Sequence, residues 1–351
     1  MSDWLNEDAR AEADMRRLVE MNPSHANDHR TLARLLKKHD RVEEAVPILQ
    51  HVLSFDASTT GDFRALAKAL LTMKRDAEAE SVCTAGIAAW PDYNCLYMLR
   101  GNARWHQDKT EAARQDYDRA LELNARCVSA LLNRGNLSRG QGDTDGMLED
   151  WLKVLDREPK NTKAHQHLAN HFLGQQMWDQ CLFHAGEAIR KAPSNARARA
   201  MFGRAQFELG EGEAALDDLD RAVSDGPDIA EVHKQRGIVL VKLGHPDLQI
   251  EDCRIALQNA PGDTGIAFNL GVRLAQTGSV AEAFDIFDDL VSRRGRLSDH
   301  RWRGECHRLL GRLPKAIADL EHALSMKGIS DENFTWITEK IAAARKAMAE
   351  E

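Results

Sequence analysis

Apolar and polar positions follow one another along most of the chain with the spacing of an α-helix. Leu219 follows Leu216 by three residues, and Ala222 and Val223 follow Leu219 by three and four residues. This spacing places apolar side chains on one face of a helix, where they can pack against a neighbour. Breaks at glycine or proline separate such stretches, so the pattern predicts an all-α chain of short amphipathic helices.

Small residues recur within this helical pattern at a period of 34 residues. Every position reached from Gly101 in steps of 34 is glycine or alanine, with the last step one residue shorter. A small side chain lets two helices approach closely, where a larger one would hold them apart. The recurrence therefore predicts a repeated pair of packed helices. The series is Ala33, Ala67, Gly101, Gly135, Ala169, Gly203, Gly237, Gly271 and Gly304.

Proline and glycine mark the ends of the predicted helices within each period. Proline cannot continue the interior of a helix and stands near the end of several periods. Glycine permits the tight turn between the two helices of a pair. The prolines are Pro91, Pro159, Pro193, Pro227 and Pro261, and the glycines are Gly142, Gly210, Gly244, Gly278 and Gly311.

The glycine-rich run RGQGDTDG at residues 139–146 has some features of a phosphate-binding loop. No predicted strand precedes the run, and no Lys-Ser or Lys-Thr pair follows it, although such a loop requires both. Gly142 instead occupies the same position in its period as Gly210 and Gly244. We therefore interpret the run as a turn between two helices.

The 34-residue unit has small residues at positions 8, 20 and 27 and proline at position 32, and so resembles the tetratricopeptide repeat. The resemblance covers residues 26–330 as nine units and implies a right-handed α-solenoid of antiparallel helix pairs. Met147 and Gln249 depart from the pattern at the second small position, and Pro246 falls near the start of a second helix. The units start near Ala26, Thr60, Asn94, Val128, Thr162, Ala196, Ala230, Thr264 and Leu297.

The two ends of the chain predict additional single helices. Residues 1–25 contain one helix that ends at Pro23 and form a partial unit. Residues 331–351 form a capping helix, with Ser330 as its N-cap. Terminal helices of this kind cover the apolar face that an end repeat would otherwise expose. The apolar face of the last helix is predicted to consist of Phe334, Ile337, Ile341 and Ala344.

The composition is acidic, with a net charge of -8, 29% charged residues and 6% aromatic residues. No apolar run approaches the ~20 residues that a membrane-spanning helix needs, and the N-terminus lacks the pattern of a signal peptide. The six cysteines are widely spaced without a CxxC pair, which favours free thiols in a reducing compartment. These features predict a cytoplasmic protein without membrane insertion.

The best candidate for a metal site is the run AHQHLANHFL. His167 and His171 lie four residues apart and share a helix face, but the repeat places no carboxylate or cysteine ligand beside them. The chain has no GxSxG motif, and Cys83 and Cys181 occupy packing positions. We therefore predict no catalytic residue, no metal site and no cofactor.

Aromatic and acidic residues on the predicted helices have structural interpretations. Trp90 and Trp151 are predicted to fill gaps between helices rather than to form a stacking platform. Acidic pairs on second helices, such as Asp217 and Asp218, are predicted to lie on solvated outer faces.

In the tetratricopeptide family, the first helix of each pair lines a concave groove, and positions 2, 5, 6, 9, 12 and 13 of the repeat face it. In this chain those positions carry a net positive charge, although the whole chain carries -8. A positive groove would attract an acidic peptide, and asparagine amides could bond its backbone. The alternative is a mixed surface, on which the cations pair with carboxylates of other units. The predicted groove residues are Arg30, Arg34, Lys37, Arg64, Lys68, Asn102, Trp105, Asn133, Asn136, Arg139, Lys163, His167, Asn170, Arg197 and Arg204.

Some members of the family bind a C-terminal carboxylate through a clamp of lysine, asparagine and arginine residues. Asn102, Asn133 and Lys163 match three clamp positions, whereas Met98 and His167 replace two of the cations. The clamp is incomplete, which argues against binding of chaperone tails.

The sequence thus predicts a non-enzymatic scaffold or adaptor that binds an acidic or carboxylate-bearing peptide. The alternative is a substrate-recognition or assembly subunit of a larger enzyme or chaperone complex. Nucleic acid is disfavoured as a partner because the chain is acidic and poor in aromatic residues. Self-association stays open, and the sequence does not identify the partner.

Overall fold

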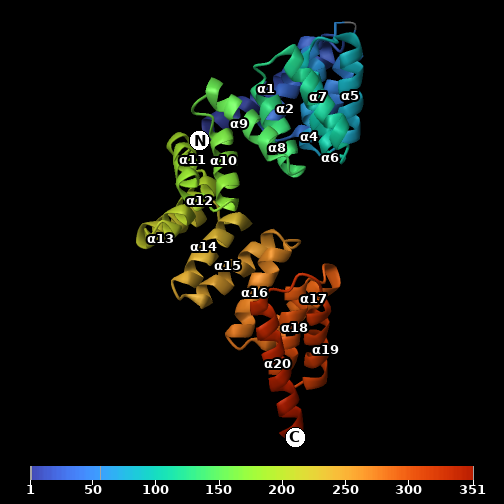
Figure 1. The fold of residues 1–351 in the computed structure, drawn as a ribbon. Helices are drawn as coiled ribbons and strands as arrows, with labels where there is room; N and C mark the ends of the chain where they lie inside the picture. Colours follow the sequence, from blue (N-terminus) through green and yellow to red (C-terminus); the bar gives the residue numbers. More distant parts are fainter. Residues whose placement is uncertain (1, 56, 351) are drawn as a thin grey trace. The chain divides into compact units, whose positions relative to one another are not determined.

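A computed structural model describes residues 2–55 and 57–350 and shows only helices as regular structure in these ranges (Figure 1). The chain divides into two compact units, residues 1–164 and residues 165–351, and each is considered by itself below. Residues 162–174 form a helix that begins in the first unit and continues into the second. The predicted all-α fold is confirmed.

Helices of the first unit pack consecutively along the chain. The partly buried Met15 and Val19 of the first helix pack against the core of the next two helix pairs. The helices are α1 (Ser2–Met21), α2 (Ala26–Lys38), α3 (Val42–Leu53), α4 (Thr60–Thr72), α5 (Asp76–Ala89), α6 (Asn94–His106), α7 (Thr110–Leu123), α8 (Val128–Gly140), α9 (Thr144–Arg157) and α10 (Thr162–Gly174).

The second unit continues the same consecutive packing. We use "helix pair" for an even-numbered helix and the odd-numbered helix that follows it, from α2–α3 to α18–α19. The remaining helices are α11 (Trp178–Lys191), α12 (Ala196–Glu208), α13 (Gly212–Asp225), α14 (Ala230–Lys242), α15 (Pro246–Asn259), α16 (Thr264–Gln276), α17 (Val280–Arg293), α18 (Leu297–Leu309), α19 (Leu313–Ser325) and α20 (Asp331–Glu350).

The recurring small residue of the first helix makes room for a large side chain of the second. In α8–α9, a Cβ atom added to Gly135 would lie 2.5 Å from Nε1 of Trp151, which is fully buried. In α6–α7, a Cβ atom on Gly101 would lie 2.7 Å from the ring of Tyr117. In α10–α11, which carries Ala169 in place of this glycine, the residue at the partner position is the small Ala185. The prediction that Trp151 fills a gap between helices is therefore confirmed.

The turn inside each helix pair has a residue with positive φ at the same position of the repeat. Gly142 has φ +78°, and the side chain of Asp143 accepts a hydrogen bond from the N–H of Gly146 at the start of α9. The glycine-rich run is thus a turn, as predicted. Only some of these turns carry glycine, and the others hold an L-residue in a conformation that glycine adopts more easily. The non-glycine residues are Asp40, Lys74, Asp108 and Gln176.

Pairs of a half-buried arginine and a buried aspartate join the two helices of several helix pairs. Arg134 of α8 bonds Asp150 of α9 through two nitrogens, at 2.7 and 2.8 Å, and also bonds Asp118 of the preceding helix pair. Burial of a charge is tolerated where a partner and hydrogen bonds compensate it. The other pairs, each sixteen residues apart, are Arg100–Asp116, Arg236–Asp252 and Arg303–Asp319.

Asp218 corrects one prediction about the acidic residues of the second helices. Asp217 is exposed as expected, but Asp218 is half-buried, and its carboxylate accepts a hydrogen bond from the buried Arg199 at 3.0 Å. The reason is that α12 and α13 pack face to face at this position, so Asp218 faces its own helix pair rather than solvent.

At the C-terminal end, α20 packs on α18 and α19. Ile337, Ile341 and Ala344 are buried as predicted, and Oγ of Ser330 accepts a hydrogen bond from the N–H of Asn333, as expected of an N-cap. Phe334 was wrongly predicted to belong to the packed face, because its side chain is 54% exposed. The packed face is rotated relative to the prediction, since Asn333 and Trp336 make the contacts of the first turns with α18.

Candidate functional site

Four cations of the first unit form a cluster on α2 and α4. Arg34, Arg64 and Lys68 are exposed, and Lys37 is half-buried. Burial lowers the pKa of Lys37, and the positive charges of Lys68 and Arg64 lower it further. Among the side chains that the structure describes, none of the four cations has an ion-pair partner. We call these four residues the α2/α4 cation cluster.

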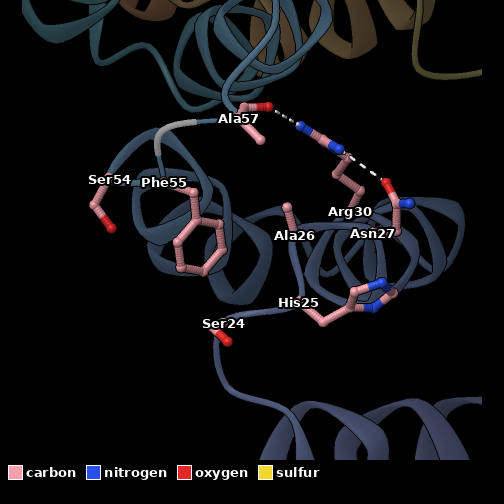
Figure 2. A pocket seen from close by; sticks show the side chains of 8 residues that line it. All are labelled: Ser24, His25, Ala26, Asn27, Arg30, Ser54, Phe55 and Ala57. Atoms are coloured by element: carbon pink, nitrogen blue, oxygen red, sulfur yellow. Dashed lines mark hydrogen bonds between the residues drawn. The ribbon is translucent and has the colours of Figure 1, made fainter.

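Arg30 lies on the same helix as the cluster but has a carboxylate partner. Its guanidinium donates two hydrogen bonds of 2.7 Å to the two oxygens of Asp62, and Figure 2 shows its further bonds to Asn27 and to the carbonyl of Ala57. Burial acts to raise the pKa of Asp62, but the hydrogen bonds from Arg30 and Thr59 outweigh it and lower the pKa. The charge of Arg30 is therefore largely compensated within the protein.

A cleft of about 520 Å³ opens beside Arg30, between the start of α2 and the connection from α3 to α4 (Figure 2). Apart from Arg30, its side chains are small or uncharged except for His25, whose Nδ1 lies 2.8 Å from the carboxylate of Asp28. The cleft therefore adds no unpaired cation to the cluster. It is lined by Ser24, His25, Ala26, Asn27, Arg30, Ser54, Phe55 and Ala57.

Two predicted groove asparagines are brought together by α6 and α8. Nδ2 of Asn133 donates to Oδ1 of Asn102 at 2.7 Å, and the hydroxyl of Tyr117 donates to the same oxygen at 2.9 Å. Because a carbonyl oxygen has two lone pairs, Oδ1 of Asn102 has no capacity left for a ligand. Trp105 is half-buried against the core of this region. Asn102 and Asn133 therefore use part of their hydrogen-bonding capacity within the protein and are only partly available to bind a peptide.

The other predicted groove residues are distributed over both units. In the first unit, Arg139 and Lys163 are exposed and Asn136 is half-buried. In the second unit, Asn170 and Arg197 are exposed and His167 is half-buried.

In the second unit, some cations of the even-numbered helices share a carboxylate. Arg204 donates two hydrogen bonds to Glu208, at 2.6 and 3.0 Å, and Lys242 of the next helix pair bonds the same carboxylate at 2.5 Å. Burial acts to raise the pKa of Glu208, but the bonds from Lys242 and Arg204 outweigh it and lower the pKa. Glu305 is shared in the same way by Arg308 and Lys340.

A cleft of about 390 Å³ lies beside Arg204 and is lined by residues of α10, α12 and α14, together with Gln176 before α11 and Trp178 at its start. The charged residues that line it are of both signs: Arg204 and Lys234 are positive, and Glu231 is negative. Glu231 forms an ion pair with Lys234 at 3.4 Å. This region matches the mixed surface that the sequence left open. The cleft is lined by Asn170, Leu173, Gly174, Gln176, Trp178, Arg204, Glu231, Lys234, Gln235 and Ile238.

The residues with the greatest potential for catalysis are held in unreactive environments. All six cysteines are free, as predicted, and burial raises the pKa of Cys83 and of Cys181 to about 12. Nδ1 of His165 lies 2.9 Å from Nδ1 of His184, whose pKa burial and His165 lower to about 4. Among the described residues, no group of three or more histidine, cysteine, aspartate or glutamate side chains is arranged to hold a metal ion.

Within the part of the chain that the structure describes, none of the helices combines the length and the apolar character needed to cross a bilayer.

The consecutive helix pairs are the architecture of an α-solenoid. The comparison with known families agrees with the resemblance that the sequence indicated. A family model described as tetratricopeptide repeat matches residues 98–162, 167–229 and 200–264. Residues 98–162 and 167–264 thus match the tetratricopeptide repeat, in agreement with the resemblance. Such repeats indicate a protein–protein interaction scaffold, and proteins of this family are typically not enzymes. No curated protein sequence matches the chain.

Solved structures with a similar fold are tetratricopeptide repeat proteins at low sequence identity. A repeat protein of Parabacteroides merdae has 16% identity and a TM-score of 0.50, and the match covers 71% of this chain and 97% of that one. A thermophilic repeat protein of Thermus thermophilus has 20% identity and a TM-score of 0.44, with 52% of this chain and 98% of that chain covered.

A chain of the APC/C hetero-tetramer Cut9–Hcn1 is similar over more of this protein. The identity is 12% and the TM-score 0.50, with 96% of this chain and 59% of that chain covered. At these identities the likeness describes the fold alone.

Proposed function

We propose that the chain is a scaffold that binds an acidic segment of a partner protein at the α2/α4 cation cluster. The observation that carries the proposal is a group of four cations without a carboxylate partner among the described side chains. The lowered pKa of Lys37 supports it, because burial and repulsion by Lys68 and Arg64 cause the shift.

Carboxylates of a ligand would supply the charge that the cluster lacks. Arg34 and Arg64 each present a planar guanidinium that can bind a carboxylate through two hydrogen bonds. Lys37 and Lys68 would each gain a compensating charge, and the mutual repulsion of the four cations would fall. Arg30 is excluded from this role because Asp62 already occupies its guanidinium. An acidic peptide segment is thus the ligand class that fits the cluster best.

The test is binding of a fluorescein-labelled poly-glutamate peptide, followed by fluorescence anisotropy at low and physiological salt. The variant Arg34→Glu with Lys68→Glu reverses two exposed charges of the cluster. We expect its affinity for the peptide to fall by about tenfold or more, and the salt dependence of binding to weaken.

The matched control is Arg221→Glu with Lys191→Glu, which makes the same charge change at exposed positions of α13 and α11. If the control weakens binding as much as the cluster variant, the peptide responds only to net charge, and the proposal is wrong. Undiminished binding by the cluster variant would contradict it equally.

A further inference from the structure

In several helix pairs, a side chain near the start of the first helix bonds to the turn that precedes that helix. In α2, α6, α12 and α14, the side chain of the fourth residue bonds to the backbone carbonyl of the proline six residues earlier. In α6, for example, the hydroxyl of Tyr97 donates to the carbonyl oxygen of Pro91 at 3.0 Å. This contact fills the space between neighbouring helix pairs and compensates a backbone acceptor. The same contact joins His29 to Pro23, Arg199 to Pro193 and His233 to Pro227.

Helix α16 lacks this side chain. Its fourth residue is Ala267, whereas every other even-numbered helix from α2 to α18 has a larger residue there. The preceding turn is the same, because the N–H of Asp263 donates to the carbonyl of Ala260 as the N–H of Tyr93 does to that of Trp90. Among the described residues, no group donates to the carbonyl of Pro261.

The missing side chain leaves a pocket of about 540 Å³, which both Pro261 and Ala267 line. This volume lies in the range of small-ligand sites. The interior is apolar, with Leu257 of α15, Leu270 of α16 and Ile286 of α17 around Ala267. The pocket lies on α15, α16 and α17, so it is separate from the α2/α4 cation cluster and does not depend on the proposed function.

The rim of the pocket carries an unbalanced negative charge. Arg254 pairs with Glu282 at 3.0 Å, and Arg293 pairs with Asp289 at 3.1 Å. Asp285 also lines the pocket and is exposed, and it has no ion-pair or hydrogen-bond partner among the described residues. A ligand with a positive charge beside its apolar part would complement this rim.

We propose that this pocket binds a tyrosine side chain of a partner protein, with a basic residue next to that tyrosine. The ring would occupy the space beside Ala267, and its hydroxyl would donate to the carbonyl of Pro261, as Tyr97 does to Pro91 within this chain. The basic residue would pair with Asp285. The ligand thus supplies from outside the side chain that the other helix pairs supply from within.

The experiment compares three short peptides on the full chain by saturation-transfer NMR titration. Acetyl-Arg-Tyr-amide carries the ring, the hydroxyl and the positive charge. Acetyl-Arg-Phe-amide lacks the hydroxyl, and acetyl-Glu-Tyr-amide has the opposite charge. We expect the Arg-Tyr peptide to bind, and each of the other two to bind about fivefold to tenfold more weakly.

Two variants locate the binding. Ala267→Tyr should fill the pocket with the chain's own side chain and abolish binding of the Arg-Tyr peptide. Ala77→Tyr, at an exposed position of α5, is the matched control and should bind as the wild type does. Asp285→Lys changes only an exposed rim residue, and it should reverse the preference in favour of the Glu-Tyr peptide.

Three outcomes would overturn the proposal. They are equal binding of the Arg-Tyr and Arg-Phe peptides, retained binding by a folded Ala267→Tyr variant, and an unchanged charge preference of Asp285→Lys. If Ala267→Tyr does not fold, as judged by circular dichroism, the Asp285→Lys result decides.

Discussion

The α2/α4 cation cluster differs from the cations Arg204, Lys242 and Arg308 of α12, α14 and α18 in that the latter are paired with carboxylates. Burial lowers the pKa of Lys37, and the positive charges of Lys68 and Arg64 lower it further. Arg204 and Lys242, in contrast, share the carboxylate of Glu208. A net positive charge summed over the predicted groove positions therefore does not by itself produce a positive surface.

The cause of the difference is visible in the two sets of helices. Glu208 lies four residues after Arg204 and one repeat before Lys242, so helix spacing and repeat spacing bring both cations to it. In α2 and α4 the acidic residues are Asp28 and Asp62, near the helix starts, where they bond His25 and Arg30. Among the described side chains, no carboxylate is therefore paired with the four residues of the α2/α4 cation cluster.

The largest expected effect comes from removing the buried carboxylate of an arginine–aspartate pair. Asp150→Ala leaves Arg134 without its main partner, and we expect the free energy of unfolding to fall by about 3 kcal/mol. Chemical denaturation followed by circular dichroism measures the change. Asp118→Ala removes the exposed partner of Arg134 and should cost about 0.5 kcal/mol.

The same site allows a stronger test of the pairing. Leu32 with Ile48, and Leu270 with Ile286, occupy the positions of this ion pair in two other helix pairs. The double variant Arg134→Leu with Asp150→Ile should therefore recover most of the stability lost in Asp150→Ala. A double variant as unstable as the single variant would contradict this interpretation.

A smaller effect is expected from making the second unit resemble the first. Glu208→Gln frees Arg204 and Lys242 from their shared carboxylate. In the Arg34→Glu, Lys68→Glu background, it should strengthen poly-glutamate binding by about threefold at low salt. Anisotropy titration measures this, with Glu213→Gln at an exposed position of α13 as the control. Equal gains in both variants would show that net charge alone decides.

Removing a charge from the cluster should stabilise the protein slightly. Lys37→Met keeps the apolar stem of the side chain and removes the repulsion from Lys68 and Arg64, so we expect a gain of about 0.5 kcal/mol at neutral pH. Folding lowers the pKa of Lys37 below its ordinary value of 10.5, so its protonated form opposes folding. The gain should be full below the lowered pKa and shrink as the pH rises through it toward 10.5. A gain that is independent of pH would contradict the assignment.

The smallest effect concerns the pH dependence of peptide binding. An acidic ligand favours the charged form of Lys37 and so raises its pKa. Affinity for poly-glutamate should therefore fall by about twofold as the pH rises through the lowered pKa of Lys37 in the free protein. Lys37→Arg should remove this dependence, because arginine stays charged throughout the range. A dependence that persists in Lys37→Arg would assign it to another group.

Much of the fold could be predicted from the sequence because it depends on local spacing. Gly135 and Trp151 illustrate this, since their spacing within one helix pair fixes their contact. The orientation of α20 could not be predicted, because Phe334 has helical spacing to Ile337 and Ile341 in the sequence but lies 54% exposed in the structure. Which face of a terminal helix packs depends on contacts with a helix pair that the local pattern does not describe.

The candidate site could be predicted only in part. The residue types at the groove positions predicted which residues are cations. Their ion pairs could not be predicted, because they join side chains of different helices, as Arg30 of α2 and Asp62 of α4 show. The pocket beside Ala267 did leave a signal in the sequence. Alignment of the repeats places alanine where the others have a larger residue, and the meaning of that gap became clear only from the contact of Tyr97 with Pro91.

Some arginines of the arginine–aspartate pairs bind an additional aspartate, and this affects how the chain unfolds. Arg134, Arg236 and Arg303 each reach back to an aspartate of the preceding helix pair. Where this bridge exists, melting of one helix pair also removes a bond from its neighbour, so cooperativity passes across that junction. Native-state hydrogen exchange would then divide the solenoid into blocks whose borders fall at the unbridged junctions.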